Sequence, residues 1–563
     1  MGSDNRVSAT GCRKATTFYA LQTTCYILFF FPLPASAQNP IAATLAENPA
    51  RNFHFVAARL LAGRDTALAW GQLDSLLAEP TGDMFWTYPA TAFYFYFRDF
   101  LTDEHRAAYR RVWKEWTPYR GDTENHFLMY YETLYLMAQE WPDLPGTEWF
   151  NGKSSEENFR EAEEYLDHWI EETTRYGQTE WDSPRYFYFY VLPLLTLYDH
   201  ADDPRMAKQA GMMLELLLAD YAVDYLDGRY CGAHSRDGDG SVIDPLKAEA
   251  RAWSDFWWED SVSLVLPDLV FALRSDFDPP DIIRRIAHDR SRPLTSFEQK
   301  RSRAKMRYSD ELYTPVYRTT YMTERWAIGS IQGGLQQPIQ QHTWDITFAT
   351  ERPNSTIYAL HPYASAHELG MFFPEEPELM EAGILASKAS YGSSDKPIGG
   401  SPFEEIRQHR GTLFGHYEIP VDTRFAHVDF ILPSALFDDE LRTIDGWMLL
   451  RVEGEPVGIR IDRAASQKWI RGEKIDRLRL TGEQIDYTVV IGVGAEGSDQ
   501  EVIARMTAQA GRDSATAHAV PTFTDQLFLG PHLKSERGTG IITMRQGGEV
   551  RVLDFIEGTI VTE

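Results

Sequence analysis

Cysteine is scarce in this sequence. The 563 residues include three cysteines, and only Cys231 lies outside the first 37 residues. A framework of disulfides, which holds many small secreted domains together, is therefore excluded for residues 38–563. The residue directly after the expected cleavage point at Ala37 is not a cysteine, so nothing indicates a lipid anchor. We interpret Cys231 as a small buried side chain.

Long apolar runs, phosphate-binding loops and positive charge are also lacking. Beyond residue 37 no window reaches the roughly 20 apolar residues of a membrane helix, and no glycine-rich phosphate loop or dinucleotide fingerprint is present. Lys and Arg number 55 against 83 Asp and Glu, a net charge of −28. Such a surface is a poor partner for nucleic acid, although arginines gathered in one cleft could still bind an acidic polysaccharide. We expect no membrane span, no nucleic-acid partner and no required cofactor.

The N-terminus has the pattern of a secretory signal. Basic residues Arg6, Arg13 and Lys14 precede an apolar run over 26–33, and Ala35-Ser36-Ala37 supplies the small residues of a cleavage site. We predict a signal peptide over residues 1–37 with cleavage after Ala37. The protein is therefore expected to be exported, either periplasmic or secreted.

Size and composition indicate at least two domains. A chain of 563 residues exceeds what one hydrophobic core usually serves. Hydrophobic residues make up 43% and aromatics 13%, which argues against disorder. We predict a multidomain α + β chain, with an N-terminal (α/α) toroid over 38–300 and a C-terminal antiparallel β-sandwich over 301–563. The oligomeric state is left open.

Outer and inner helices alternate in the first part. Ser154-Ser155-Glu156-Glu157 is a capping box before a helix with one apolar face, whereas 212–226 is apolar nearly all round. This alternation favours a toroid of helical hairpins. A solenoid of tandem repeats is the alternative, but no fixed period supports it. The other predicted helices are 57–77, 102–116 with Thr102 as its cap, 125–140, 186–198 and 253–273.

Short β-rich runs separated by turns follow a basic, proline-containing segment over 276–305. Runs of this kind are typical of an antiparallel sandwich. The predicted strands are 344–350, 426–432, 447–452, 487–493 and 541–554, the last around a Gly-Gly turn.

The densest polar cluster is 121–126, which ends in Asn125 and His126 at the start of a predicted helix. An amide and an imidazole at a helix N-terminus can bind an anionic group, because the helix dipole also favours negative charge there. The alternative is simple capping by Asp122 or Thr123, with His126 packed below.

Two further loops carry candidate residues. Tyr186 follows the polar segment 181–185, and it could act as a general acid or base if a cation lay beside it. Packing in the core is the alternative. The glycine-containing loop 230–237 carries His234 and Arg236, and it is either the edge of a cleft or a surface turn.

The β-rich part contains possible metal ligands. His342, Asp345 and His361 have the side chains that zinc or calcium could use, although three residues at this spacing are not diagnostic. A structural zinc or calcium in this part is one interpretation, and no metal is the other.

In this order, the four clusters resemble those of the heparinase II/III-like and oligoalginate lyase group, an uncharacterised branch of it. The resemblance implies a helical toroid joined to an antiparallel β-sandwich and cleavage of uronic-acid polysaccharides by β-elimination. It implies that Asn125 and His126 neutralise the uronate carboxylate and that Tyr186 transfers a proton, with His342 or His234 in the other acid–base role. The His-x-His-x-Asp order of the group is replaced here by Gln340-x-His342-x-x-Asp345.

An acidic polysaccharide or oligosaccharide is the partner that the resemblance implies. Stacking and ion pairing with this substrate are predicted for residues that flank the acid–base candidates. These are Arg185, Arg236, Tyr188, Trp181 and Glu124.

Two other functions remain open at this point. A glycoside hydrolase would need two carboxylates about 5 Å apart or about 6.5 to 9.5 Å apart, and a glycan-binding protein would need only exposed aromatics. The carboxylates available for hydrolysis are Asp122, Glu124, Glu180, Asp182, Glu259 and Asp260. The polysaccharide, the position of cleavage and the protonated histidine are not determined by the sequence.

Overall fold

The computed structural model describes residues 39–301, 314–333, 340–363, 377–387, 389–517 and 524–563. The predicted signal peptide lies outside these residues. Within them, no helix is both long enough and apolar enough to cross a membrane.

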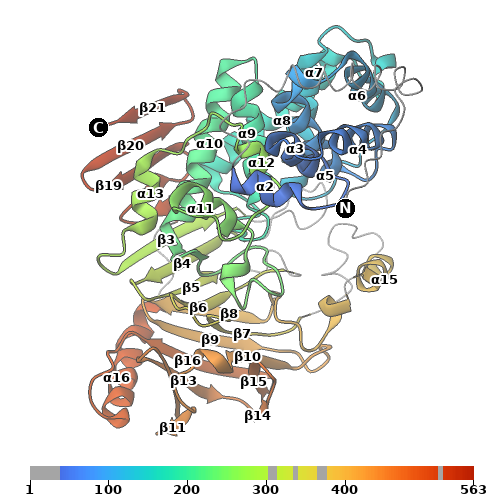
Figure 1. Ribbon diagram of the computed structural model, residues 1–563. Coiled ribbons are helices and arrows are strands. Elements are labelled where there is room, and N and C mark those ends of the chain that lie inside the picture. The colour runs from blue at the N-terminus through green and yellow to red at the C-terminus, as the bar shows by residue number, and fades with distance from the viewer. Residues whose placement is uncertain (1–38, 302–313, 334–339, 364–376, 388, 518–523) are drawn as a thin grey trace, which may run out of the picture.

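The first part of the chain is helical (Figure 1). α5 and α9 are buried around most of their circumference and lie inside, whereas α6 and α8 bury one face and lie outside. The helices are α2 (Pro40–Ala46), α3 (Phe53–Ala62), α4 (Thr66–Ala78), α5 (Met84–Tyr96), α6 (Asp103–Glu115), α7 (Glu124–Glu140), α8 (Ser155–Tyr176), α9 (Tyr188–His200), α10 (Pro204–Val223), α11 (Ala250–Trp258), α12 (Leu269–Ala272) and α13 (Asp281–His288).

The inner helices pack against one another. α5 packs on α3, α7 and α9, and the short α12 contacts α3, α5 and α9. α8 begins as the sequence predicts, because Ser154 and Glu157 form a capping box in which Glu157 accepts the Ser154 amide at 2.7 Å. The predicted helical toroid is confirmed.

The second part is built from antiparallel strands. They are β3 (Leu294–Lys300), β4 (Val316–Met322), β5 (Trp326–Gln332), β6 (Trp344–Phe348), β7 (Thr356–Leu360), β8 (Glu404–His409), β9 (Thr412–Glu418), β10 (His427–Pro433), β11 (Arg442–Ile444), β12 (Trp447–Val452), β13 (Glu455–Arg463), β14 (Ser466–Ile470), β15 (Ile475–Thr481), β16 (Gln484–Ile491), β17 (Gln526–Leu529), β18 (Leu533–Glu536), β19 (Ile541–Gln546), β20 (Glu549–Asp554) and β21 (Thr559–Thr562).

The described strands of this part form two sheets. The larger has the order β14-β15-β10-β7-β6-β5-β4-β3-β17-β18-β19-β20-β21, and the smaller has the order β11-β12-β13-β16-β9-β8. Trp344 and Phe430 of the larger sheet pack on Tyr487 of the smaller one, which makes the predicted sandwich. At the other end of the larger sheet, Phe528 and Met544 belong to the core of the toroid. One sheet therefore backs both halves of the molecule.

The structure corrects the extent of several predicted elements. The predicted helix 57–77 is interrupted at Gly63, where φ is 63°, so that α3 and α4 are separate. The predicted helix 253–273 is α11 followed by a loop and α12. α15 (Pro377–Ser387) and α16 (Asp499–Ala517) lie in the part for which only strands were predicted. The predicted boundary after residue 300 falls at the end of β3, so β3 lies on the helical side of it.

Buried charges join the toroid to the larger sheet. The Lys300 ammonium on β3 lies 3.0 Å from Asp182, 2.6 Å from Asp220 and 3.1 Å from Glu298. Arg318 on β4 pairs with Asp224 of the toroid and with Glu298 at 3.3 Å. Because these ions are buried, each needs its partners across the junction. The loops that carry the candidate residues are fixed at this junction.

Candidate active site

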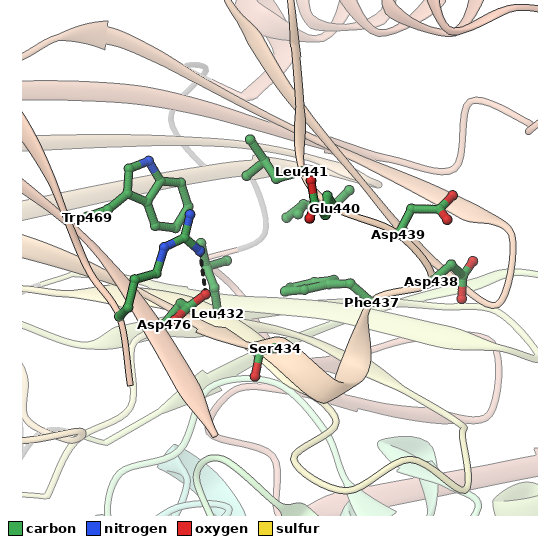
Figure 2. Close-up of a pocket in the computed structure, with 11 residues that line it drawn as sticks. Leu432, Ser434, Phe437, Asp438, Asp439, Glu440, Leu441, Trp469 and Asp476 are labelled. Atoms are coloured by element: carbon green, nitrogen blue, oxygen red, sulfur yellow. Dashed lines mark hydrogen bonds and ion pairs between the residues drawn. The ribbon is translucent and has the colours of Figure 1, made fainter. Parts of the chain in front are cut away.

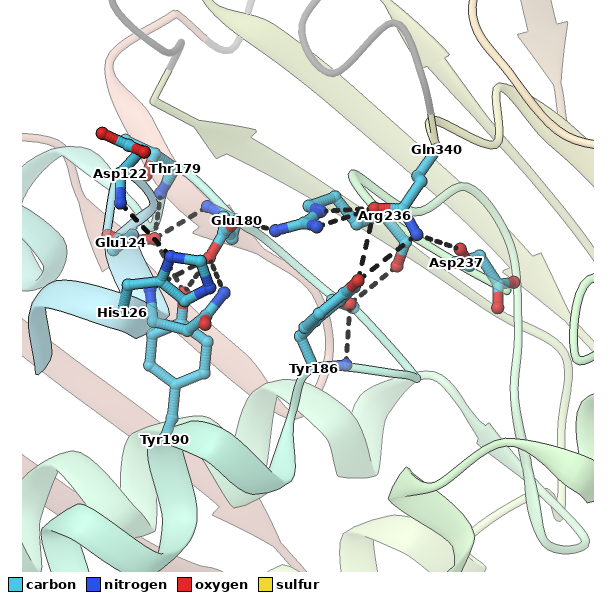
Figure 3. A network of polar contacts seen from close by, with 12 residues as sticks. Asp122, Glu124, His126, Thr179, Glu180, Tyr186, Tyr190, Arg236, Asp237 and Gln340 are labelled. Carbon is cyan, nitrogen blue, oxygen red and sulfur yellow. Dashed lines mark hydrogen bonds and ion pairs between the residues drawn. The ribbon is translucent and has the colours of Figure 1, made fainter. Parts of the chain in front are cut away.

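Tyr186 and Arg236 form the centre of the candidate site. The Arg236 guanidinium lies over the Tyr186 ring, 3.9 Å from its centroid. Arg236 also donates to Gln340 at 2.9 and 2.7 Å and to Glu180 at 2.5 Å, and the Tyr186 hydroxyl is 3.4 Å from the Gln340 amide group. Figure 3 shows Arg236 between Glu180 and Gln340 with Tyr186 beside it. Arg236 is thus a cation beside Tyr186, which is the condition for Tyr186 to act as a general acid or base.

The charge of Arg236 is secured by its surroundings. Burial alone would lower the pKa of Arg236, but Tyr186 and Glu180 raise it above its ordinary value. The guanidinium is therefore a permanent positive charge against the ring of Tyr186. Such a charge stabilises the phenolate that forms when a tyrosine gives up its proton.

Glu180 and Glu124 are buried anchors. Glu180 accepts from the Asn125 backbone amide at 3.0 Å and from the Tyr190 hydroxyl at 2.9 Å, besides Arg236. Glu124 accepts from the backbone amides of Thr179 and Glu180 at 3.0 and 2.7 Å. Because both carboxylates accept from backbone amides, they hold the segments around residues 125 and 179–180 in place. Glu124 does not line the cavity described below, and its predicted role in substrate binding stays a prediction.

Asn125 and His126 do not act as a pair in the structure. Asn125 is fully buried, and its side-chain amide donates to Glu180. His126 is partly exposed, and its Nδ1 accepts from the Asp122 backbone amide at 3.2 Å. A neutral His126 with this bond carries its proton on Nε2. The Asn125 amide is therefore bonded within the protein, and its predicted contact with a substrate carboxylate stays a prediction.

His234 and His342, which are 108 residues apart in the chain, come together at the junction. Their backbones exchange two hydrogen bonds of 2.9 Å, and their rings are stacked with centroids 6.1 Å apart. His234 Nδ1 lies 2.6 Å from the Asp182 carbonyl oxygen, so it must donate and Nε2 carries the lone pair. Burial, together with Arg318 and His342, holds the pKa of His234 well below its ordinary value. His234 is therefore a neutral acceptor.

His342 has a carboxylate partner. Its Nε2 lies 3.2 Å from Asp345 Oδ2, which orients the ring and leaves Nδ1 as the second nitrogen. His361 is elsewhere, because its Nδ1 bonds the Ser401 hydroxyl at 2.8 Å and its Nε2 bonds the Phe425 carbonyl at 2.6 Å. The predicted ligand trio of His342, Asp345 and His361 is not assembled.

Another group of possible metal ligands is present. Among the described residues, Asp182, Asp220 and Glu298 have carboxylate oxygens within reach of one ion. The Lys300 ammonium bonds all three carboxylates, so an organic cation of the chain already fills that position. These residues do not fit a metal while Lys300 is present.

A cavity of about 520 Å³ adjoins the centre of the site. Its walls include Arg185, next to Tyr186, and Gly238, next to Asp237, whose carbonyl accepts from Gln340 at 3.2 Å. The remaining lining residues are Asp239, Gly240, Ser241, Lys247, Glu249, Ala389, Ser390 and Tyr391. The volume suits a small part of a glycan chain.

The other predicted substrate-binding residues lie in different places. Trp181 is completely buried with Ala233 and Val316, so the predicted contact of Trp181 with substrate is corrected to a role in packing. Tyr188 is half-buried and packs on Phe189 at 3.9 Å.

Sequence reasoning missed three residues of this region. Gln340 bridges Arg236 and Tyr186, Asp237 lies beneath the cavity wall, and Glu249 lines the cavity. Burial raises the pKa of Asp237 to about 6, against the opposing effect of its bond from Ser241. Only Gln340 had a signal in the sequence, because it stands where the resembled group has a histidine.

A second cavity of about 560 Å³ lies in the sandwich, far along the larger sheet (Figure 2). Trp469 and Phe437 form part of its wall. Its charged lining residues are Asp438, Asp439, Glu440, Asp476 and Arg471. None of the candidate acid–base residues lines this cavity, and its excess of carboxylates opposes an acidic glycan.

No protein-family description and no curated protein matches this chain. Among solved structures, the chain is similar to the chondroitin AC lyase of Streptomyces coelicolor A3, solved in complex with chondroitin sulphate. The TM-score is 0.37 and the identity is 10%, over 98% of this chain and 90% of that chain. A similarity this low does not carry a functional argument, so the function is argued from the site.

Proposed function

We propose that this protein is a polysaccharide lyase that cleaves a uronic-acid-containing glycan by β-elimination. The observation that carries the proposal is the Arg236 guanidinium 3.9 Å from the centroid of the Tyr186 ring, beside a cavity of about 520 Å³. A tyrosine held against a buried cation is suited to give and take a proton. The toroid-and-sandwich architecture places this pair where both halves of the chain meet.

The reaction needs a base at C5 of the uronate and an acid at the leaving oxygen. Tyr186 is the candidate for one of these roles, because Arg185, which lies 5.8 Å from the centroid of its ring, lines the cavity. His234 carries a lone pair on Nε2, so it has the acceptor atom that a base needs, but its burial lowers its pKa and weakens it in that role. His342, oriented by Asp345, is the other candidate for this second role.

The negative charge of the uronate carboxylate must be offset before C5 can lose its proton. Asn125 is occupied by Glu180, and we assign the task to Arg185, which lines the cavity next to Tyr186. His126 Nε2–H is a second possible donor. The acidic glycan thus remains the expected partner.

The test is absorbance near 235 nm, where unsaturated uronates absorb, with alginate, glucuronan, ulvan and glycosaminoglycans as substrates. We expect the wild type to raise the absorbance with one of them, and Tyr186→Phe to lower kcat at least about 100-fold, as loss of an acid–base group does. Tyr198→Phe is the matched control, since Tyr198 lies on α9 against Phe277. Equal loss in both variants, or no absorbance change with any uronan, would contradict the proposal.

Hydrolysis is the second candidate, because two carboxylates line the same cavity. Glu249 is half-buried, burial raises its pKa, and Asp239 is exposed. A hydrolase would use such a pair as acid and base. New reducing ends without absorbance at 235 nm would establish hydrolysis, and saturable glycan binding with no product would establish a binding protein.

Export is part of the same proposal, because an enzyme that cleaves polymeric glycans finds its substrate outside the cell. The predicted cleavage after Ala37 leaves Gln38 as the first residue. Mass spectrometry of protein recovered from an exporting host should show this N-terminus. An intact Met1 in the exported protein would contradict the prediction.

A further inference from the structure

We infer that the cavity beside Tyr186 accepts an unsulfated uronic acid, a sugar with one negative charge, and discriminates against sulfated uronates. The inference rests on the proposed function and concerns the substrate class of the same site. It follows from Arg185, which has no acceptor among the described residues, and from the carboxylates that line the cavity.

Arg185 is the available cation. Its guanidinium is half-buried, lines the cavity and lies 5.8 Å from the centroid of the Tyr186 ring. Within the described residues it has neither a hydrogen-bond acceptor nor an ion-pair partner within 4 Å. A guanidinium has five donors in a planar fork that matches a carboxylate. One carboxylate of the ligand therefore fits this position.

Lys247 does not provide a second available cation. Its ammonium is 3.0 Å from Asp244, and its side chain is 64% exposed at the rim. An exposed lysine in an ion pair adds little to the binding of another anion, because water screens it and its partner cancels its charge. Among the described residues that line the cavity, Arg185 is thus the cation available to one anionic group.

Carboxylates occupy the rest of the polar lining. Glu249 lines the wall at the start of α11, Asp239 lies on the loop that follows Asp237, and Asp237 itself is buried behind Gly238. Glu249 and Arg185 are not in contact as an ion pair, so Glu249 can accept hydrogen bonds from sugar hydroxyls. Burial raises the pKa of Glu249, and the charge of Arg185 opposes this effect.

A sulfate on the same sugar would bring a second negative charge into this cavity. It would lie next to the exposed Asp239 or the half-buried Glu249, and beside Glu249 repulsion between like charges is stronger than in bulk solvent. A hydroxyl at the same position would instead donate to these carboxylates. The lining therefore selects the unsulfated sugar, because Arg185 attracts its carboxylate and the lining carboxylates repel a sulfate.

The experiment compares polymers with the same backbone, with and without sulfate: chondroitin against chondroitin 4- and 6-sulfate, and heparosan against heparan sulfate. We expect kcat/KM at 235 nm to be at least about tenfold higher on the unsulfated member of a pair that is cleaved, the ratio that about 1.4 kcal/mol of repulsion produces. Glu249→Gln should reduce this ratio about threefold or more. Glu557→Gln, in the exposed turn after β20, is the control and should leave the ratio unchanged.

Binding tests the inference without turnover. Calorimetry with Tyr186→Phe and oligosaccharides of the same pairs, together with alginate and glucuronan oligosaccharides, should give tighter binding of unsulfated chains, and an added Arg185→Ala should weaken it at least about tenfold. Equal or tighter binding of sulfated chains, or binding of no unsulfated uronan, would overturn the inference. If wild type shows no elimination but this variant binds unsulfated chains selectively, the proposed reaction fails and the selectivity stands.

Discussion

At the scale of single residues, the candidate site depends on what lies against each polar side chain. Arg236 contacts Glu180, Gln340 and the Tyr186 ring, so it links the loop before α9 to the sheet. The side-chain amide of Asn125, by contrast, donates to Glu180. Residue type alone could not distinguish these two situations.

Replacing Arg236 by lysine tests whether its planar charge supports Tyr186. Lysine keeps one positive charge but cannot lie flat on the ring while bonding Gln340 and Glu180. We expect kcat at 235 nm to fall about 100-fold, with a smaller change in KM. A kcat equal to that of the wild type would leave Arg236 with a structural role only.

Asp237 should make stability depend on pH. Its pKa is about 6 in the folded state against 3.8 in the unfolded chain, so the folded state holds the proton more tightly. Stability is therefore lost as pH rises from about 4 to 6.5, by about 3 kcal/mol at most. The free energy of unfolding of Asp237→Asn, measured with urea at each pH, should rise relative to that of the wild type over that range. Above the range the difference between the two proteins should stay constant. A difference that does not vary with pH would contradict the assignment.

At the scale of elements, two glycines let the toroid loop approach the sheet. A Cβ on Gly329 of β5 would lie 2.6 Å from the Gly232 Cα, and Gly232 has φ of 89°. This contact precedes the backbone pairing of His234 with His342 by two residues. The close approach of two backbones thus fixes the histidines.

Gly329→Ala should therefore damage the site from a distance. The added methyl must displace the loop, which costs roughly 1–3 kcal/mol of unfolding free energy and moves His234, so kcat should fall about tenfold or more. Gly71→Ala in α4 is the control, since its Cβ meets no atom within 4 Å and helix propensity predicts a gain of about 0.5–1 kcal/mol. Thermal unfolding and the 235 nm assay measure both. Normal activity in Gly329→Ala would argue against this positioning role.

At the scale of the whole molecule, the buried ions of the junction make the two halves depend on each other. Four carboxylates, on Asp182, Asp220, Asp224 and Glu298, surround Lys300 and Arg318. Burial raises the pKa of Glu298 to about 7, although Lys300 opposes this. Removing one cation would leave buried negative charges that face one another.

Lys300→Met should lower the free energy of unfolding by about 3–5 kcal/mol, the usual cost of leaving a buried ion without its partner. Because the loss falls at the junction, the toroid and the sandwich should then unfold in separate transitions in calorimetry. Lys153→Met removes an exposed pair with Glu161 and should cost less than about 1 kcal/mol. A single transition with an unchanged midpoint in Lys300→Met would contradict this account.

The periodic features of the sequence predicted much of the fold. The capping box at Ser154, the cap at Thr102 and the strand 447–452 are found where the patterns placed them, because these signals act within a few residues. The break at Gly63 and α16 were missed, although Ser498 and Glu501 form the same kind of capping pair as Ser154 and Glu157. A local signal was present in both places.

The sequence by itself determined which residue types stand in the polar loops, where the helices give way to strands, and that Tyr186, His234 and Arg236 had the chemistry for proton transfer. Only the tertiary structure decided their partners. In the structure, Asn125 donates to Glu180 and Trp181 is buried. His361 lies apart from His342, whereas His234 pairs with His342. The reason is physical: hydrogen bonds and ion pairs act over a few ångströms, whereas these partners are tens to more than a hundred residues apart along the chain.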